Sequence, residues 1–206
     1  MMLAGLFALV LFVGLFVGDR WYFRTLSPEA SRYGCRVGRE ETRLHAATLA
    51  RIQASFDRFG LLALRNGVAR FFADANRILL RPRYPMLWAL LWIWPMKATI
   101  DLRVDGQSLV LASTKRIPWC SAILIGGWFA LVGLGTVAAL VSYVAEGGSG
   151  TAGGWIVGAG ILILGLFFFF SGLVTVVMAY RLENSRLATV QRELEEVLTG
   201  LPVPRR

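Results

Sequence analysis

Few residues of this 206-residue chain are of types that carry chemistry. There is one histidine, His45, and there are two cysteines, Cys35 and Cys120, which lie far apart in the sequence. Two cysteines cannot complete a zinc or iron–sulfur site within one chain, and one imidazole cannot supply both axial ligands of a haem. We therefore predict no catalytic residue, no metal site and no intrinsic cofactor. Bound lipids, or contacts with cofactors held by partner subunits, remain compatible with this composition.

A lipid-modifying enzyme is the catalytic alternative. It would need a polar constellation at the membrane boundary, such as His45 with Asp57 or Asp74. His45, however, falls on a stripe of apolar residues with helical spacing, which is typical of a partly buried structural histidine. The residue types thus favour a protein that is not an enzyme.

The composition indicates a membrane protein. Hydrophobic residues make up 56% of the chain and charged residues 17%, whereas soluble domains average about 45–50% and about 25%. Three long apolar segments predict transmembrane helices at 1–18, 119–144 and 155–180, since about 20 apolar residues span a bilayer. A cleaved signal peptide is the alternative for the first segment, but a basic leading region and a small-residue cleavage site are both missing.

Charge and aromatic residues predict the orientation. The net charge is +9, and all 22 basic residues fall in 19–118 or 181–206, with none in the Gly-rich turn at 145–154. Cytoplasmic loops retain Lys and Arg, so we expect an external N-terminus, an external turn and a multi-pass protein of the inner (cytoplasmic) membrane whose soluble part is mostly cytoplasmic. Tryptophan and tyrosine collect at headgroup level, which predicts these membrane-interface residues: Trp21, Trp88, Trp92, Trp94, Trp119, Tyr143, Trp155 and Tyr180.

The predicted fold class is a mainly α membrane protein with a cytoplasmic α+β segment. Apolar spacing of three and four predicts a long amphipathic helix over about 40–81. The Trp-rich run at about 85–96 is interpreted as a short interfacial helix, with a core helix of the cytoplasmic domain as the alternative. Alternation around Asp105-Gly106 predicts a β-hairpin over about 98–114, with Ile100 opposite Leu111 and Leu102 opposite Leu109. Residues 181–206 are predicted to form an amphipathic tail helix.

Two sets of residues suggest packing roles. Small residues recur on one stripe of each later transmembrane segment, where they let helices approach closely: Gly126, Gly133, Gly158, Gly165, Gly172 and Ala179. The tail helix carries an apolar stripe that we expect to contact a cytoplasmic partner: Leu187, Val190, Leu194 and Val197.

These features lead to a functional hypothesis. The chain is interpreted as a noncatalytic accessory or scaffold subunit of a larger inner-membrane complex, such as a respiratory or photosynthetic energy-transducing assembly. Its expected partners are other membrane subunits and anionic lipids, because the basic residues are spread along a juxtamembrane segment and match no nucleic-acid motif. A lipid-responsive regulator at the membrane surface is the alternative.

Overall fold

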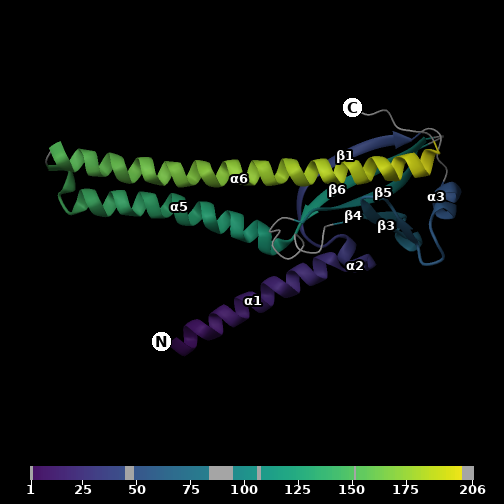
Figure 1. Cartoon of the computed structure of the whole chain (residues 1–206), viewed down its shortest axis with the longest axis horizontal. Helices are drawn as coiled ribbons and strands as arrows, with labels where there is room; N and C mark the ends of the chain where they lie inside the picture. The colour runs from purple at the N-terminus through teal and green to yellow at the C-terminus, as the bar shows by residue number, and fades with distance from the viewer. Residues whose placement is uncertain (1, 45–48, 84–94, 106–107, 151, 201–206) are drawn as a thin grey trace. The chain divides into compact units, whose positions relative to one another are not determined.

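The computed structural model describes residues 2–44, 49–83, 95–105, 108–150 and 152–200 (Figure 1). It forms two compact units. The sheet unit comprises residues 1–121 and 182–206, and the hairpin unit comprises residues 122–181.

The sheet unit is built on a six-stranded antiparallel sheet in the order β1-β6-β5-β4-β3-β2. Strands β2 to β6 form a meander, and β1 pairs with β6 at the far edge. Between β1 and β2 in the sequence lies the short helix α3 (Leu49–Ser55), and a 3-10 turn, η1 (Ala73–Ala75), joins β3 to β4. The strand bounds are β1 Cys35–Leu44, β2 Leu61–Ala63, β3 Gly67–Phe72, β4 Arg77–Pro82, β5 Lys97–Asp105 and β6 Ser108–Ile117.

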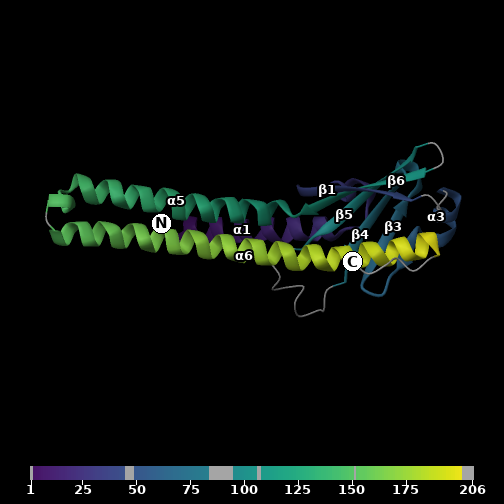
Figure 2. The ribbon, with the colours of Figure 1, turned by 90° about the horizontal axis from the view of Figure 1, so that it is seen from above.

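One face of this sheet is apolar and carries the C-terminal part of α6 (Ala152–Thr199), the yellow end of that helix in Figures 1 and 2. Gly67 lies so close to the helix that an added Cβ would overlap the Val190 side chain. Leu80 shares the face of Gly67, because Gly67 pairs with Pro82 and side chains alternate along a strand. The core of the unit includes Ile78, Leu80, Ile100, Leu111, Leu187, Val190, Leu194 and Leu198, all 2% exposed or less.

Two further helices belong to the sheet unit. Helix α1 (Met2–Arg24) is apolar almost to its end and leads through Ser27 into the single turn α2 (Pro28–Ser31). The Ser27 hydroxyl accepts a bond from the Ala30 amide at 3.1 Å, and Pro28 occupies the first turn, which is a standard N-terminal cap.

The hairpin unit consists of most of α5 (Trp119–Ala145), the 3-10 turn η2 (Gly148–Gly150) and the first part of α6. The Tyr143 hydroxyl donates to the carbonyls of Gly148 at 3.0 Å and Gly154 at 2.9 Å, which ties α5 to the start of α6. Farther along, the rings of Phe129 and Phe169 meet edge to face at 4.9 Å.

Among the described residues, three helices are long and apolar enough to cross a membrane: α1 over Gly5–Arg24, α5 over Trp119–Ala145 and α6 within Gly153–Thr199. The protein is therefore a membrane-associated chain with a mixed α+β fold. The third predicted span and the predicted tail helix form one continuous helix, α6, which runs to Thr199, since Arg181, Leu182 and Glu183 are good helix formers.

The prediction of one long helix over about 40–81 is wrong. That stretch forms the end of β1, α3 and strands β2 to β4. Strand β4 is buried on both faces, and such short apolar runs cannot be distinguished from helix by spacing alone. Gly60 and Asn76 adopt positive φ values of 71° and 45°, which interrupt a helix.

The predicted hairpin exists as β5 and β6, but its register differs. Ile100 lies opposite Ser113 rather than Leu111, and Leu102 lies opposite Leu111 rather than Leu109. Asp105 belongs to the ladder and pairs with Ser108, so the connection begins one residue later than predicted. The resulting shift is two residues, which leaves every side chain on its expected face. The Trp-rich helix predicted at 85–96 falls almost wholly outside the described residues; Pro95 and Met96 are described and buried.

Candidate functional site

The second face of the sheet is strongly basic. Residues directly opposite each other in an antiparallel pair share a face, so the register assigns Lys97 and Arg116 to the same face, and likewise Arg77 and Asp101. Three acidic residues of the described strands, Glu41, Asp101 and Asp105, lie on it. We call this surface the basic face; its cations are Arg36, Arg39, Arg43, Arg70, Arg77, Arg81, Lys97, Arg103 and Arg116.

Four of these cations hold the segment that connects α1 to the sheet. Arg70 donates to the carbonyl of Leu26 and Arg81 to that of Arg24. Arg116 donates to the Gly34 carbonyl at 3.0 Å. The fourth cation is Lys97, and we call Arg70, Arg81, Lys97 and Arg116 the cationic clamp.

Lys97 is the most deeply buried member of the clamp. Its side chain is fully buried, and Nζ donates to the carbonyls of Ala30 at 2.5 Å and Phe23 at 3.2 Å while lying 4.1 Å from the centre of the Phe23 ring. Burial, together with the charges of Arg116 and Arg81, lowers the pKa of Lys97 to about 7, although Asp19 acts in the opposite direction. The loss of water around the ammonium is thus the main reason for the low pKa of Lys97, and repulsion from Arg116 and Arg81 adds to it.

Two of the carbonyls that the clamp binds, those of Phe23 and Arg24, lie at a helix end. The last four carbonyls of an α-helix have no partner within the helix and carry the negative end of its dipole. Phe23 and Arg24 are the last two residues of α1, so Lys97 and Arg81 complete that end. A carbonyl has no formal charge, however, and these bonds do not neutralise the cations.

A carboxylate meets the basic face at one further position. Asp101 accepts from Arg77 Nε at 2.7 Å and lies 3.8 Å from Arg32, while Arg77 also donates to the Ser31 hydroxyl at 3.1 Å. The Arg77 side chain is 10% exposed and the Asp101 side chain 31%, so this pair is partly buried. The pair fixes α2 on the sheet, and the Asp101 carboxylate neutralises one cation of the basic face.

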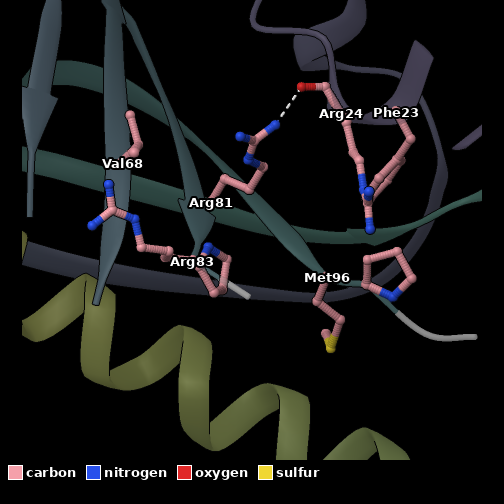
Figure 3. Close-up of a pocket in the computed structure, with 8 residues that line it drawn as sticks. Phe23, Arg24, Val68, Arg81, Arg83 and Met96 are labelled. Carbon is pink, nitrogen blue, oxygen red and sulfur yellow. Dashed lines mark hydrogen bonds between the residues drawn. The ribbon is translucent and has the colours of Figure 1, made fainter. Parts of the chain in front are cut away.

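A pocket of about 260 Å³ opens beside the clamp (Figure 3). Three arginines line it, one from the end of α1 and two from the end of β4 and the residue that follows. In Figure 3, Arg81 reaches from β4 toward the Arg24 carbonyl, with Phe23 beside Arg24 and Val68 across the opening. Its lining includes Arg24, Arg81, Arg83, Phe23, Val68 and Met96.

The glycines predicted to pack helices differ in their surroundings. An added Cβ at Gly165 would overlap Thr136, and one at Gly172 would lie 2.5 Å from Trp128 Nε1, so both face α5 at close range. Gly158 lies beside the Tyr143 ring. By contrast, a Cβ at Gly126 or Gly133 would meet nothing within 4 Å, and Ala179 is half-buried.

The stripe predicted to contact a partner lies instead in the protein's own core. Leu187, Val190 and Leu194 are at most 1% exposed against the sheet, and Val197 is 43% exposed. The sequence shows the stripe but not its target, because the pattern over 40–81, which supplies strands β2 to β4 of the sheet, predicts a helix instead. Leu198, which continues the stripe, was not among the predicted contacts and is fully buried.

Of the predicted interface residues, Trp21, Trp119, Trp155 and Tyr180 are exposed, while Tyr143 ties α5 to α6. Trp88, Trp92 and Trp94 lie outside the described residues, as does His45.

Asp57 accepts bonds from the amides of Phe59 and Leu61 and shapes the turn before β2. Within the described ranges, no group of three or more His, Cys, Asp or Glu residues could hold a metal ion.

The clamp residues are not among the site residues predicted from the sequence. A signal was present: Lys97, Thr99, Asp101 and Arg103 alternate with apolar residues along one strand, which places them on one face. Their convergence with Arg70, Arg81 and Arg116 depends on pairing between strands distant in the sequence.

Comparisons with known proteins do not assign the chain to a family, because no family model, curated protein or solved structure matches it.

Proposed function

We propose that this protein is a noncatalytic membrane protein whose sheet unit binds anionic lipid headgroups through its basic face. The observation that carries the proposal is the cationic clamp: four cations are gathered where α1 enters the sheet, and each donates to an uncharged carbonyl. An anion from outside the chain would complete this arrangement.

The position of the clamp favours a lipid as the source of that anion. The clamp encloses the C-terminal end of α1, an apolar helix of membrane-spanning length, so it belongs at the boundary between bilayer and water. Each Lys or Arg near an anionic membrane surface contributes about 1 kcal/mol of attraction. By the distribution of basic residues, this surface is the cytoplasmic face of the inner membrane.

A test uses the full chain reconstituted in phosphatidylcholine vesicles that contain a trace of fluorescent phosphatidylglycerol or fluorescent phosphatidylcholine. We expect energy transfer from tryptophan to be stronger to the anionic lipid, and the difference to shrink as salt is added, because salt screens exposed charges. The triple variant Arg36→Gln, Arg39→Gln, Arg103→Gln should lose part of the preference. The exposed Arg58, which lies outside the basic face, provides the control Arg58→Gln. Equal transfer to both lipids at low salt would refute the proposal.

A subunit role in a larger membrane complex is the second candidate. The observation that favours it is an apolar groove of about 300 Å³ on the hairpin unit, lined by residues that include Leu140, Val144, Ala159 and Leu162. Close helix packing in membranes uses small residues and such grooves. The mass of the species extracted from native membranes in mild detergent tests this role: a free monomer would exclude it, and co-migration with other subunits would identify the host.

A further inference from the structure

We propose that the pocket beside the clamp binds the phosphate group of a single anionic lipid, with Arg81 and Arg83 as its principal ligands. This inference rests on the proposed function and deepens it. The basic face as a whole would attract negative charge without regard to shape, whereas the pocket would hold one headgroup at a defined position.

The chemistry of the lining supports a phosphate. Arginine presents five donors in a planar fork that matches phosphate oxygens, and Arg–phosphate bonds are frequently bidentate. Arg81 donates to the Arg24 carbonyl, which fixes the orientation of its guanidinium at the pocket. Arg83 is exposed and follows β4 directly, and its main chain is held in place by a 2.8 Å bond from its amide to the Asn66 carbonyl. The pocket thus combines one anchored arginine with one accessible arginine.

Electrostatics at the pocket reinforce this assignment. Lys97 lies next in sequence to the pocket residue Met96, and its ammonium adds to the charge of the three arginines when it is protonated. Burial is the main cause of its lowered pKa, and repulsion from Arg116 and Arg81 adds to it. A bound phosphate would relieve that repulsion, and an uncharged ligand would not.

The remaining lining favours a lipid over a soluble phosphate. Phe23, Val68 and Met96 give the pocket an apolar part beside its cationic part. A phospholipid carries both kinds of surface next to each other, at the phosphate and at the glycerol and first acyl carbons. Phe23 also belongs to the last turn of α1, so the apolar side of the pocket adjoins an apolar membrane helix.

The test measures lipid retention by native mass spectrometry of the full chain in detergent, where no bilayer surface contributes. The probes are phosphatidic acid, phosphatidylcholine as the lipid without net charge, and glycerol 3-phosphate as the soluble phosphate. We expect one phosphatidic acid per chain to be retained in preference to phosphatidylcholine, and glycerol 3-phosphate not to displace it. Arg83→Gln should weaken retention about fivefold, since one cation at an anionic headgroup contributes about 1 kcal/mol.

Two further variants make the result decisive. Arg81→Gln should weaken retention at least as much, and Arg58→Gln, with the same loss of charge on an exposed arginine elsewhere, should leave it unchanged. Arg83 is exposed, so its variant keeps the experiment informative even if the half-buried Arg81 proves necessary for folding.

The contrary outcomes separate the two proposals. The assignment of the pocket as a phosphate site would be overturned if Arg83→Gln and Arg58→Gln retained phosphatidic acid equally well. It would also be overturned if phosphatidic acid were retained no better than phosphatidylcholine. The salt-dependent lipid preference in vesicles would still decide the proposed function. If glycerol 3-phosphate displaced phosphatidic acid when both were present at equal concentration, the inference that the ligand is a lipid rather than a soluble phosphate would be overturned.

Discussion

The two lysines of the chain lie on opposite faces of the same sheet and have opposite kinds of partner. Lys115, 2% exposed, donates to the Glu40 carboxylate at 2.5 Å and to Asn184 Oδ1 at 2.7 Å on α6. Lys97 is buried just as deeply but donates to two carbonyls. One lysine is neutralised within the fold, and the other contributes to a positive field that the bonds around it do not cancel.

The faces as a whole differ in the same way. The apolar face buries Leu187, Val190 and Leu194 of α6, and each fully buried side chain of this kind contributes about 1.5–3 kcal/mol. On the basic face, Lys97 and Arg116 instead donate to the main-chain carbonyls of Phe23, Ala30 and Gly34. These bonds do not neutralise the cations, whose charge can therefore act on solvent ions or on a ligand. The comparison indicates that one face provides stability and that the other provides orientation and charge.

The largest effect should come from the apolar face. Replacing the fully buried Leu194 by alanine should lower the free energy of unfolding by about 2–5 kcal/mol, because the variant leaves a cavity between helix and sheet. Val197→Ala on the same helix is the matched control, since that side chain is 43% exposed, and it should cost less than about 1 kcal/mol. Denaturant titration of the full chain in micelles, followed by hydrogen exchange of β4, measures both. Equal losses would contradict the placement of this helix face.

How far the sequence predicts this division depends on the range of the interactions involved. The stripe Leu187, Val190, Leu194 and the polar alternation of β5 are local periodic patterns, and both are visible in the sequence. The sheet is not, because β4 is buried on both faces and its run of apolar residues also fits a helix. The clamp depends on Arg70, Arg81 and Arg116 meeting across three strands, which single-sequence patterns do not contain.

The next effect concerns Lys97 and pH. Its pKa is about 7 in the folded protein and about 10.5 when exposed, so between these values the unfolded state binds more protons. The free energy of unfolding should therefore rise with pH from 7 to about 10, by about 1.4 kcal/mol per pH unit at most. Above pH 10 it should fall, because a hydrogen bond to Asp19, followed by burial, raises the pKa of Tyr33 to about 12 and the folded state then holds the extra proton.

Variants of the two lysines separate this effect from general changes with pH. Lys97→Met should abolish the rise between pH 7 and 10. Lys115→Met, on the opposite face, should keep it even if the variant is less stable overall. Denaturant titrations at several pH values measure the slopes, and a rise that survives in Lys97→Met would assign it to another group.

The smallest effect on stability should come from the exposed part of the basic face. A small effect there would separate a role in binding from a role in holding the fold together. Arg36, Arg39 and Arg103 are exposed, and Arg39 forms a salt bridge only with its half-exposed neighbour Glu41 among the described residues. Exposed ion pairs contribute about 0–1 kcal/mol, so each single change to glutamine should alter the free energy of unfolding by no more than about 0.5 kcal/mol. A strong loss of stability would mean that these arginines hold the fold, as the apolar face does. Unchanged stability together with a weaker preference for phosphatidylglycerol would mean that their charge serves a ligand outside the chain, which is the property that distinguishes this face from the other.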